Sequence, residues 1–253
     1  MHLTDEAIVC AVLPHGEHGA VVRLFTPSAG LVAAYVRGGR SRKVRPVLQP
    51  GNLVQASLRG RVDEQLPGAA LELLRSRALL AMDRLAAPGV EWLCGVTAVT
   101  LAEGLAYPQL HSGLAGLLDV MDHADDPRLW IAGLVRYELL LLQHLGFGLD
   151  LPECAATGAR DDLVYVSPKS SKAVSRGAGE PYAAKLLPLP AFLHGQGGTP
   201  GWEDIADGLK TTGHFLERDL LNYGRRGEML KARERLVNRI GQKLSDSSSP
   251  PPT

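Results

Sequence analysis

Residues 6–37 read EAIVCAVLPHGEHGAVVRLFTPSAGLVAAYVR, and this stretch decides the fold of the first part of the chain. Residues 6–13 are rich in β-branched side chains, 19–26 alternate around Val22 and Leu24, and 31–37 alternate through Leu31, Ala33 and Tyr35. Both features are typical of β-strands. The intervening TPSAG has a proline early and a glycine late, as hairpin turns do. The stretch therefore predicts three consecutive strands.

Two more strands are predicted further along the chain, at NLVQASLRG (52–60) and around GAALELLRS (68–76). Five short strands within about 75 residues favour a small closed barrel, because closing the sheet removes its unpaired edges. We expect this barrel to form an N-terminal domain of residues 1–80.

After Asp83 the spacing of apolar residues changes to that of helices. In one of these segments Leu134, Tyr137, Leu141 and Leu145 form a stripe that we expect to be buried. The predicted helices cover 90–106, 111–124, 127–147, about 202–222 and 226–243, and a Gly/Pro/Ser-rich irregular segment covers 152–200. The prediction is an α+β chain in which a helical domain (81–244) follows the barrel and a low-complexity disordered tail (245–253) follows the helices.

The composition is that of a globular protein outside the membrane. Of 253 residues, 45% are apolar and only 5% aromatic. No stretch approaches the roughly 18 uninterrupted apolar residues that a membrane span needs. The N-terminus carries Asp5 and Glu6 where a signal peptide has basic residues, so we expect a cytoplasmic protein. Its three cysteines are too few and too scattered for a disulfide framework.

Charge is unevenly distributed, although the chain has 27 basic and 27 acidic residues. Both ends carry a surplus of basic residues and the middle carries a surplus of acidic ones. Residues 37–46, RGGRSRKVRP, contain five basic side chains and no acid. Such asymmetry indicates that the ends meet a polyanion.

The basic run follows the third strand and is predicted to form a long loop at one side of the barrel. Small barrels of this kind commonly bind single strands through a positive groove and stacked aromatics. Residues 1–80 hold only two aromatics of the Phe/Tyr/Trp class, Phe25 and Tyr35, and either could belong to the core. Of these two contributions to single-strand binding, the one that remains is neutralisation of phosphates by basic side chains, which does not depend on base sequence. The alternative is an ordinary solvated loop. The candidate nucleic-acid-binding residues are Arg23, Arg37, Arg40, Arg42, Lys43, Arg45, Arg59 and Arg61.

No catalytic motif is visible: the chain has neither a Gly-Lys phosphate loop nor a GxSxG nucleophile turn. His15, Glu17 and His18 could suggest a metal-dependent hydrolase, but they lie in a glycine-bearing turn between two strands, which favours a polar loop. Cys154 opens a Gly-containing loop where a zinc knuckle could begin. A structural zinc site needs four ligands, and no cysteine follows Cys154, which predicts a small buried side chain instead.

Three further stretches are distinctive: VLQPGNLV (47–54), LLLLQHLGFGLDLPECAATG (139–158) and DLVYVSPKSSKAVSRGAGEPYAAKLLPLPAFL (162–193). The mixture of residues in the last stretch is not dictated by helix or strand periodicity. In these stretches and in the order of its elements, the chain resembles the RecO family of recombination mediators over about residues 1–240, and 162–193 is the most specific part of the resemblance.

This resemblance implies an N-terminal OB-fold, a helical C-terminal domain and no catalysis. It implies binding of single- and double-stranded DNA, strand annealing, association with the nucleoid, and work with RecR to load RecA onto DNA coated by single-stranded DNA-binding protein (SSB). It also implies that the helical domain binds the acidic C-terminal tail of SSB, for which Arg128 and Arg136 are candidates. The rival interpretation within the binding class is an RNA-binding OB-fold protein.

One departure from the family concerns zinc. Many relatives carry four cysteines in the segment that begins here at Cys154. This chain keeps the first, has Thr157 at the C-x2-C spacing, and lacks the later ones. We therefore expect no zinc and no other cofactor, with the loop held by packing and hydrogen bonds.

Overall fold

The computed structural model of the chain describes residues 2–60, 66–195, 198–221 and 227–248. Its contacts divide the chain into two compact units, Met1–His123 and Ala124–Thr253, which we call the barrel unit and the helical unit. The three helices that follow the barrel in sequence therefore group with it, whereas the sequence places a boundary after residue 80.

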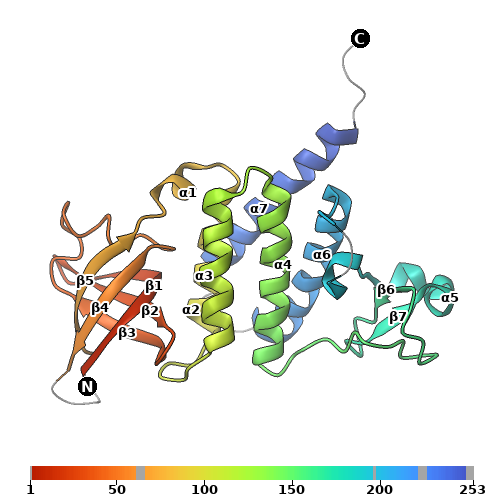
Figure 1. Cartoon of the computed structure of the whole chain (residues 1–253), viewed down its shortest axis with the longest axis horizontal. Helices are drawn as coiled ribbons and strands as arrows, with labels where there is room; N and C mark the ends of the chain where they lie inside the picture. The colour runs from red at the N-terminus through yellow and green to blue at the C-terminus, as the bar shows by residue number, and fades with distance from the viewer. Residues whose placement is uncertain (1, 61–65, 196–197, 222–226, 249–253) are drawn as a thin grey trace, which may run out of the picture. The chain divides into compact units, whose positions relative to one another are not determined.

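The barrel unit begins with five strands that close into a barrel in the order β1-β2-β3-β5-β4 (Figure 1). Their bounds are β1 His2–His15, β2 Gly19–Thr26, β3 Gly30–Val36, β4 Leu53–Arg59 and β5 Gly68–Arg75. Neighbouring strands are antiparallel except β3 and β5, which meet in parallel at Tyr35 and Gly68. Strand β1 is long because its first half pairs with β4 and its second half with β2. This arrangement confirms the predicted OB-fold barrel.

Alternation along β3 decides which side chains fill the barrel. Val32, Ala34 and Val36 belong to the buried core cluster, together with Val22 and Leu24 of β2. Leu31, Ala33 and Tyr35 have the opposite parity and therefore lie on the outer face. Phe25 is fully buried, but Tyr35 is only partly buried.

Helices α1 (Ala78–Met82), α2 (Ala86–Thr100) and α3 (Pro108–His123) complete the barrel unit. The expected helix 90–106 is wrong at its C-terminal end, because the chain leaves the helical path after Thr100. Gly104 adopts a positive φ of 72° and its N–H donates to the carbonyl of Leu31, which ties the turn to the barrel. Arg77, which is buried, forms ion pairs with Asp119 and Asp122 and so joins the end of β5 to α3.

The helical unit is built on α4 (Pro127–His144), α6 (Trp202–Phe215) and α7 (Gly227–Ser248), and a short π-helix, η3 (Leu216–Leu221), continues α6. Of the predicted stripe, Leu134, Tyr137 and Leu141 are buried, while Leu145 at the end of α4 is partly exposed. Residues 245–248, expected in a disordered tail, are instead the last turn of α7. The rest of that expected tail, 249–253, lies outside the described residues.

The irregular segment contains a small sheet that the sequence does not predict. Its order is β7-β6-β8, with β6 Leu163–Val166, β7 Ala173–Ser175 and β8 Leu187–Pro188. Helix α5 (Arg176–Gly179) and the 3-10 helix η1 (Glu180–Lys185) connect β7 to β8, and a second 3-10 helix, η2 (Ala191–His194), lies between β8 and α6. Strands of two to four residues are too short to show an alternating pattern. In the part of the chain that the structure describes, no helix is both long and apolar enough to cross a bilayer.

Candidate nucleic-acid interface

The basic loop, residues 37–46, is folded on its own backbone. The N–H of Arg45 donates to the carbonyl of Ser41 at 2.9 Å, and the N–H of Val44 donates to Ser41 Oγ at 3.2 Å. These bonds form a helix-like turn. Gly38 adopts a positive φ of 67°, which glycine tolerates without strain and which lets the chain reverse as it leaves β3. The sequence predicted a long loop after the third strand, and the structure folds that loop compactly.

The inner side of this turn is anchored in the barrel. Leu48 belongs to the barrel core, and Val44 and Val47 pack against that core. The side-chain amide of Asn52, which is fully buried, donates to the carbonyls of Pro46 and Val47 at 2.8 and 3.1 Å. Its Oδ1 accepts from the N–H of Arg77 at 2.8 Å. Because Leu48, Asn52 and Arg77 are buried, the loop is held in one conformation by the barrel beneath it.

The outer side of the turn carries the cations. All five basic side chains are exposed: Arg37, Arg40, Arg42, Lys43 and Arg45. Arg40 Nη1 donates to the carbonyl of Glu17 at 3.1 Å, which ties the loop to the β1–β2 turn. Within the described ranges, none of the five forms an ion pair. Their charges are therefore available to a ligand.

The remaining predicted cations differ in availability. Arg59 is exposed at the end of β4, where it lies opposite His2 and Gly68. Arg61 lies outside the described residues. Arg23 forms an ion pair with Glu103 at 2.7 Å, and its side chain is only 24% exposed. The charge of Arg23 is thus already neutralised, which sequence could not show because Glu103 follows a helix eighty residues later.

Two aromatic rings lie beside the basic loop. The rings of His15 and Tyr35 meet edge to face with centroids 5.7 Å apart. The backbone of Gly19 passes directly under Tyr35, where a β-carbon would collide with the ring. The N–H of Tyr35 donates to the carbonyl of Pro67 at 2.8 Å. The pair therefore lies between the β1–β2 turn, which Arg40 also contacts, and the start of β5. This pair was not predicted from the sequence. Alternation along the strand could have indicated it, because an inward-facing Val36 places the neighbouring Tyr35 on the outer face of the barrel.

The polar turn between β1 and β2 does not gather its side chains into a metal site. His15 contacts Tyr35, while His18 and Glu17 stand 3.9 Å apart and are almost fully exposed. Among the residues that the structure describes, no three His, Cys, Asp or Glu side chains are grouped so as to hold a metal ion.

In the helical unit, Arg128 contacts the residue that caps its own helix, α4. Asp126 caps α4 by accepting from the N–H of Arg128 at 2.9 Å, and the Arg128 guanidinium binds the same carboxylate through Nε and Nη2. Hydrogen bonding to Arg128 lowers the pKa of Asp126, and the same pair raises the pKa of Arg128. The charge of Arg128 is therefore compensated locally.

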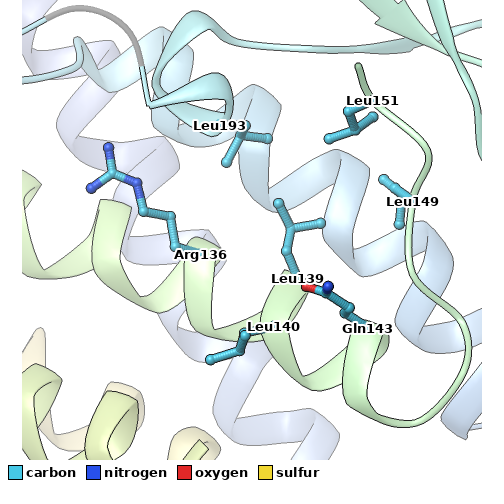
Figure 2. A pocket seen from close by; sticks show the side chains of 7 residues that line it. All are labelled: Arg136, Leu139, Leu140, Gln143, Leu149, Leu151 and Leu193. Atoms are coloured by element: carbon cyan, nitrogen blue, oxygen red, sulfur yellow. The ribbon is translucent and has the colours of Figure 1, made fainter. Parts of the chain in front are cut away.

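Arg136 borders a pocket of about 330 Å³. Its Nη2 donates to the carbonyl of Phe192 at 3.1 Å, and its guanidinium lies 5.7 Å from the centroid of the Phe192 ring. Figure 2 shows Arg136 at one end of the site and leucines from α4, from the segment after it and from η2 along the rest. The lining residues are Arg136, Leu139, Leu140, Gln143, Leu149, Leu151 and Leu193.

Cys154 lies against β7 and is only 2% exposed. Its Sγ accepts hydrogen bonds from the N–H and the hydroxyl of Ser175 at 3.2 and 3.3 Å. Burial alone would raise the pKa of this thiol, but hydrogen bonds from Ser175, Thr157 and the Ala156 N–H outweigh it and lower the pKa to about 6. The neighbours of the sulfur are hydroxyl and amide donors, which do not fit a zinc site.

The barrel places the first unit in the class of OB-fold proteins, whose members commonly bind oligonucleotides. Comparison with known families defines the chain further. Residues 1–75 match the family model described as Recombination protein O N terminal, and residues 83–227 match Recombination protein O C terminal.

Curated relatives agree over nearly the full length. A protein named DNA repair protein RecO from Caulobacter vibrioides NA1000 is 48% identical, over 86% of this chain and 89% of its own. Proteins of the same name are 41% identical in Cereibacter sphaeroides KD131, over 96% and 99%, and 44% identical in Rhodopseudomonas palustris BisB5, over 99% and 100%. The chain belongs to the RecO family of DNA repair and recombination proteins.

Proposed function

We propose that this chain is a non-catalytic recombination mediator that binds single- and double-stranded DNA through the basic loop. It anneals complementary strands and works with RecR to load RecA onto SSB-coated DNA. The observation that carries the proposal is the folded basic loop, which presents five exposed cations above an apolar anchor.

A pre-folded cationic loop suits a ligand of repeating negative charge. Binding phosphates releases counterions, and this gain does not depend on base sequence. Since Asn52 and Leu48 already fix the loop, little ordering entropy is lost when DNA binds. The ring of Tyr35, with His15 against it, provides a surface on which an unpaired base can stack, at a gain of about 1–3 kcal/mol per base.

The pocket beside Arg136 is our candidate site for the SSB tail. Its leucine lining suits apolar side chains of a peptide, and the guanidinium at its border suits the acidic character of that tail. Arg128 contributes less to this site, because Asp126 already compensates its charge. We further propose that the Cys154 loop needs no zinc, since Ser175 and Thr157 hydroxyls hydrogen-bond to its sulfur.

The decisive experiment replaces Arg40, Arg42, Lys43 and Arg45 with alanine. Each phosphate contact contributes about 0.7 to the log–log salt slope on single strands, so the slope should flatten by roughly 3 if all four are engaged. Binding should weaken for single strands and duplexes alike, and annealing on SSB-coated complementary strands should slow in step. Parallel titrations with DNA and RNA of equal length separate the proposal from an RNA-binding role.

A matched control removes four exposed cations from the region of the small sheet, at Arg160, Lys169, Arg176 and Lys185. It loses the same charge but should retain the salt slope. An unchanged slope in the folded loop variant would overturn the proposal and leave the basic run as a solvated loop.

A further inference from the structure

Helix α7 carries a second row of cations. Ala232, Leu236 and Ile240 are buried, so one face of the helix is fixed against the helical unit. On the rest of the surface, basic residues recur at every fourth position. We call this set the α7 row: Lys231, Arg235, Arg239 and Lys243.

The α7 row is presented to solvent. Lys231, Arg235 and Lys243 are exposed and Arg239 is partly exposed. Residues four apart are neighbours on a helix surface, and the rise of 1.5 Å per residue spreads the row over about 18 Å. In Figure 1 the C-terminal turns of α7 extend past α6, the helix with which α7 packs.

Most of the other exposed residues of α7 between 231 and 245 are polar. Asn238, Gln242 and Ser245 are exposed on the same helix. Among the described side chains of α7, residues 229–245, Glu234 is the only acid. Arg233 does not join the row: it points inward and forms a bidentate ion pair with the buried Glu138.

We propose that the α7 row is a second DNA-binding surface, which takes the phosphate backbone of a strand other than the one held by the basic loop. This inference rests on the proposed function and extends it, since it gives one chain two strand-binding sites. Annealing needs two strands held close together, and linking two binding events on one chain raises their effective concentration.

A nucleic-acid backbone fits the row better than an acidic peptide does. Peptide-binding sites concentrate their energy in apolar anchors that fill pockets, as the leucine pocket beside Arg136 could. The exposed face around the α7 row offers charge and amide groups instead. A strand within a duplex presents a phosphate about every 3.4 Å, so several phosphates fall within the length of the row.

The test uses the full-length chain with all four residues of the α7 row changed to glutamine, which preserves helix propensity. A matched variant, called the exchange variant, keeps all four positive charges but swaps lysine and arginine: Lys231→Arg, Arg235→Lys, Arg239→Lys and Lys243→Arg. Circular dichroism and thermal melting establish that both are folded. If the α7 row binds backbone phosphates, the exchange variant behaves as the parent chain.

Three measurements are expected to separate the variants. With short oligonucleotides, binding stoichiometry should fall from two strands per chain to one in the glutamine variant. Energy transfer between two non-complementary labelled strands should disappear, and annealing should slow by about 10²-fold, the lower end of the gain from linking two sites. The strand that remains bound should keep the salt slope set by the basic loop.

The outcomes distinguish the two proposals. If the glutamine variant keeps two strands per chain and anneals normally, while the basic-loop variant loses binding, only the inference about α7 fails. If the basic-loop variant binds normally, the proposed function fails whatever α7 does. A glutamine variant that loses only binding of an acidic peptide would assign the row to a protein partner and overturn its role with DNA.

Discussion

The arginines of the basic loop and two arginines of the helical unit, Arg128 and Arg233, carry the same charge but differ in their partners. In the basic loop they are exposed, and within the described chain none of the five cations of that loop forms an ion pair. In the helical unit, Arg128 is bound to Asp126 and Arg233 to the buried Glu138. Arg233 and Lys231 are two residues apart, yet the Arg233 side chain is only 11% exposed and Lys231 is exposed. Available charge therefore depends on burial and partners and cannot be counted from sequence.

The largest expected effect comes from breaking the internal arginine pair. Glu138 is fully buried, and Arg233 also donates to the carbonyl of Leu209 at 2.8 Å. Glu138→Ala should therefore lower the free energy of unfolding of the helical unit by about 3–5 kcal/mol, because it leaves a buried charge unpaired. Chemical denaturation measures the loss. Arg235→Gln is the control and should stay within about 0.5 kcal/mol; similar losses in both would erase the contrast.

The next effect concerns the anchor beneath the basic loop. Asn52→Leu removes three hydrogen bonds and leaves the N–H of the buried Arg77 without its partner, at a cost of about 1–3 kcal/mol. DNA affinity should fall as well, although no cation is changed. Arg42→Ala should do the reverse, weakening binding with little change in melting temperature. Full DNA affinity in a folded Asn52→Leu variant would show that the loop needs no fixed shape.

The third prediction concerns the pKa of Cys154, whose sulfur accepts hydrogen bonds from hydroxyl groups. Its thiolate should form with a midpoint near pH 6, which alkylation followed by peptide mass analysis can measure. Because the pKa of the Cys154 thiol in the folded protein lies below its ordinary value, its thiolate stabilises the fold. This contribution to the free energy of unfolding is complete only at a pH above the ordinary pKa of the thiol. It is lost progressively as the pH falls through about 6. Ser175→Ala should raise the pKa of Cys154, because it removes a hydroxyl that donates to the sulfur. Ser170→Ala, which changes an exposed serine, is the control and should leave that pKa unchanged.

Metal content gives a separate check on the same loop. Purified protein should contain well under one zinc per chain, and a chelator should leave its melting temperature unchanged. Stoichiometric zinc that is lost on replacing Cys154 would overturn our account of this loop.

The smallest effect compares the two arginines of α4. Arg136→Glu should weaken binding of an SSB tail peptide, because it places negative charge beside the leucine pocket. Arg128→Glu should weaken it less, and neither change should affect binding of naked DNA. Fluorescence anisotropy with a labelled peptide compares them. Loss of DNA binding with intact peptide binding would reverse the assignment of the two units.

Sequence predicted the elements whose patterns are long and regular. The strands 19–26 and 31–37 and the long helices were predicted because alternation or helical spacing persists over seven or more residues, and the strand 6–13 because β-branched side chains are frequent in it. The sheet around β6 was missed because its strands are shorter than one such pattern. Sequence also could not show that Glu103 neutralises Arg23 or that Tyr35 meets His15, since those contacts join segments distant along the chain.

Closure of the barrel has a consequence for the order of folding. The parallel pairing of β3 and β5 brings together Tyr35 and Gly68, and β1 pairs with β4 across an even longer stretch of chain. Such non-local pairings form slowly, since loop entropy is lost before the contacts repay it. A chain emerging from the ribosome thus cannot complete this barrel until β5 has been synthesised. The hairpin of β2 and β3 forms earlier and exposes an unpaired edge, so the nascent chain is most prone to aggregate during that interval.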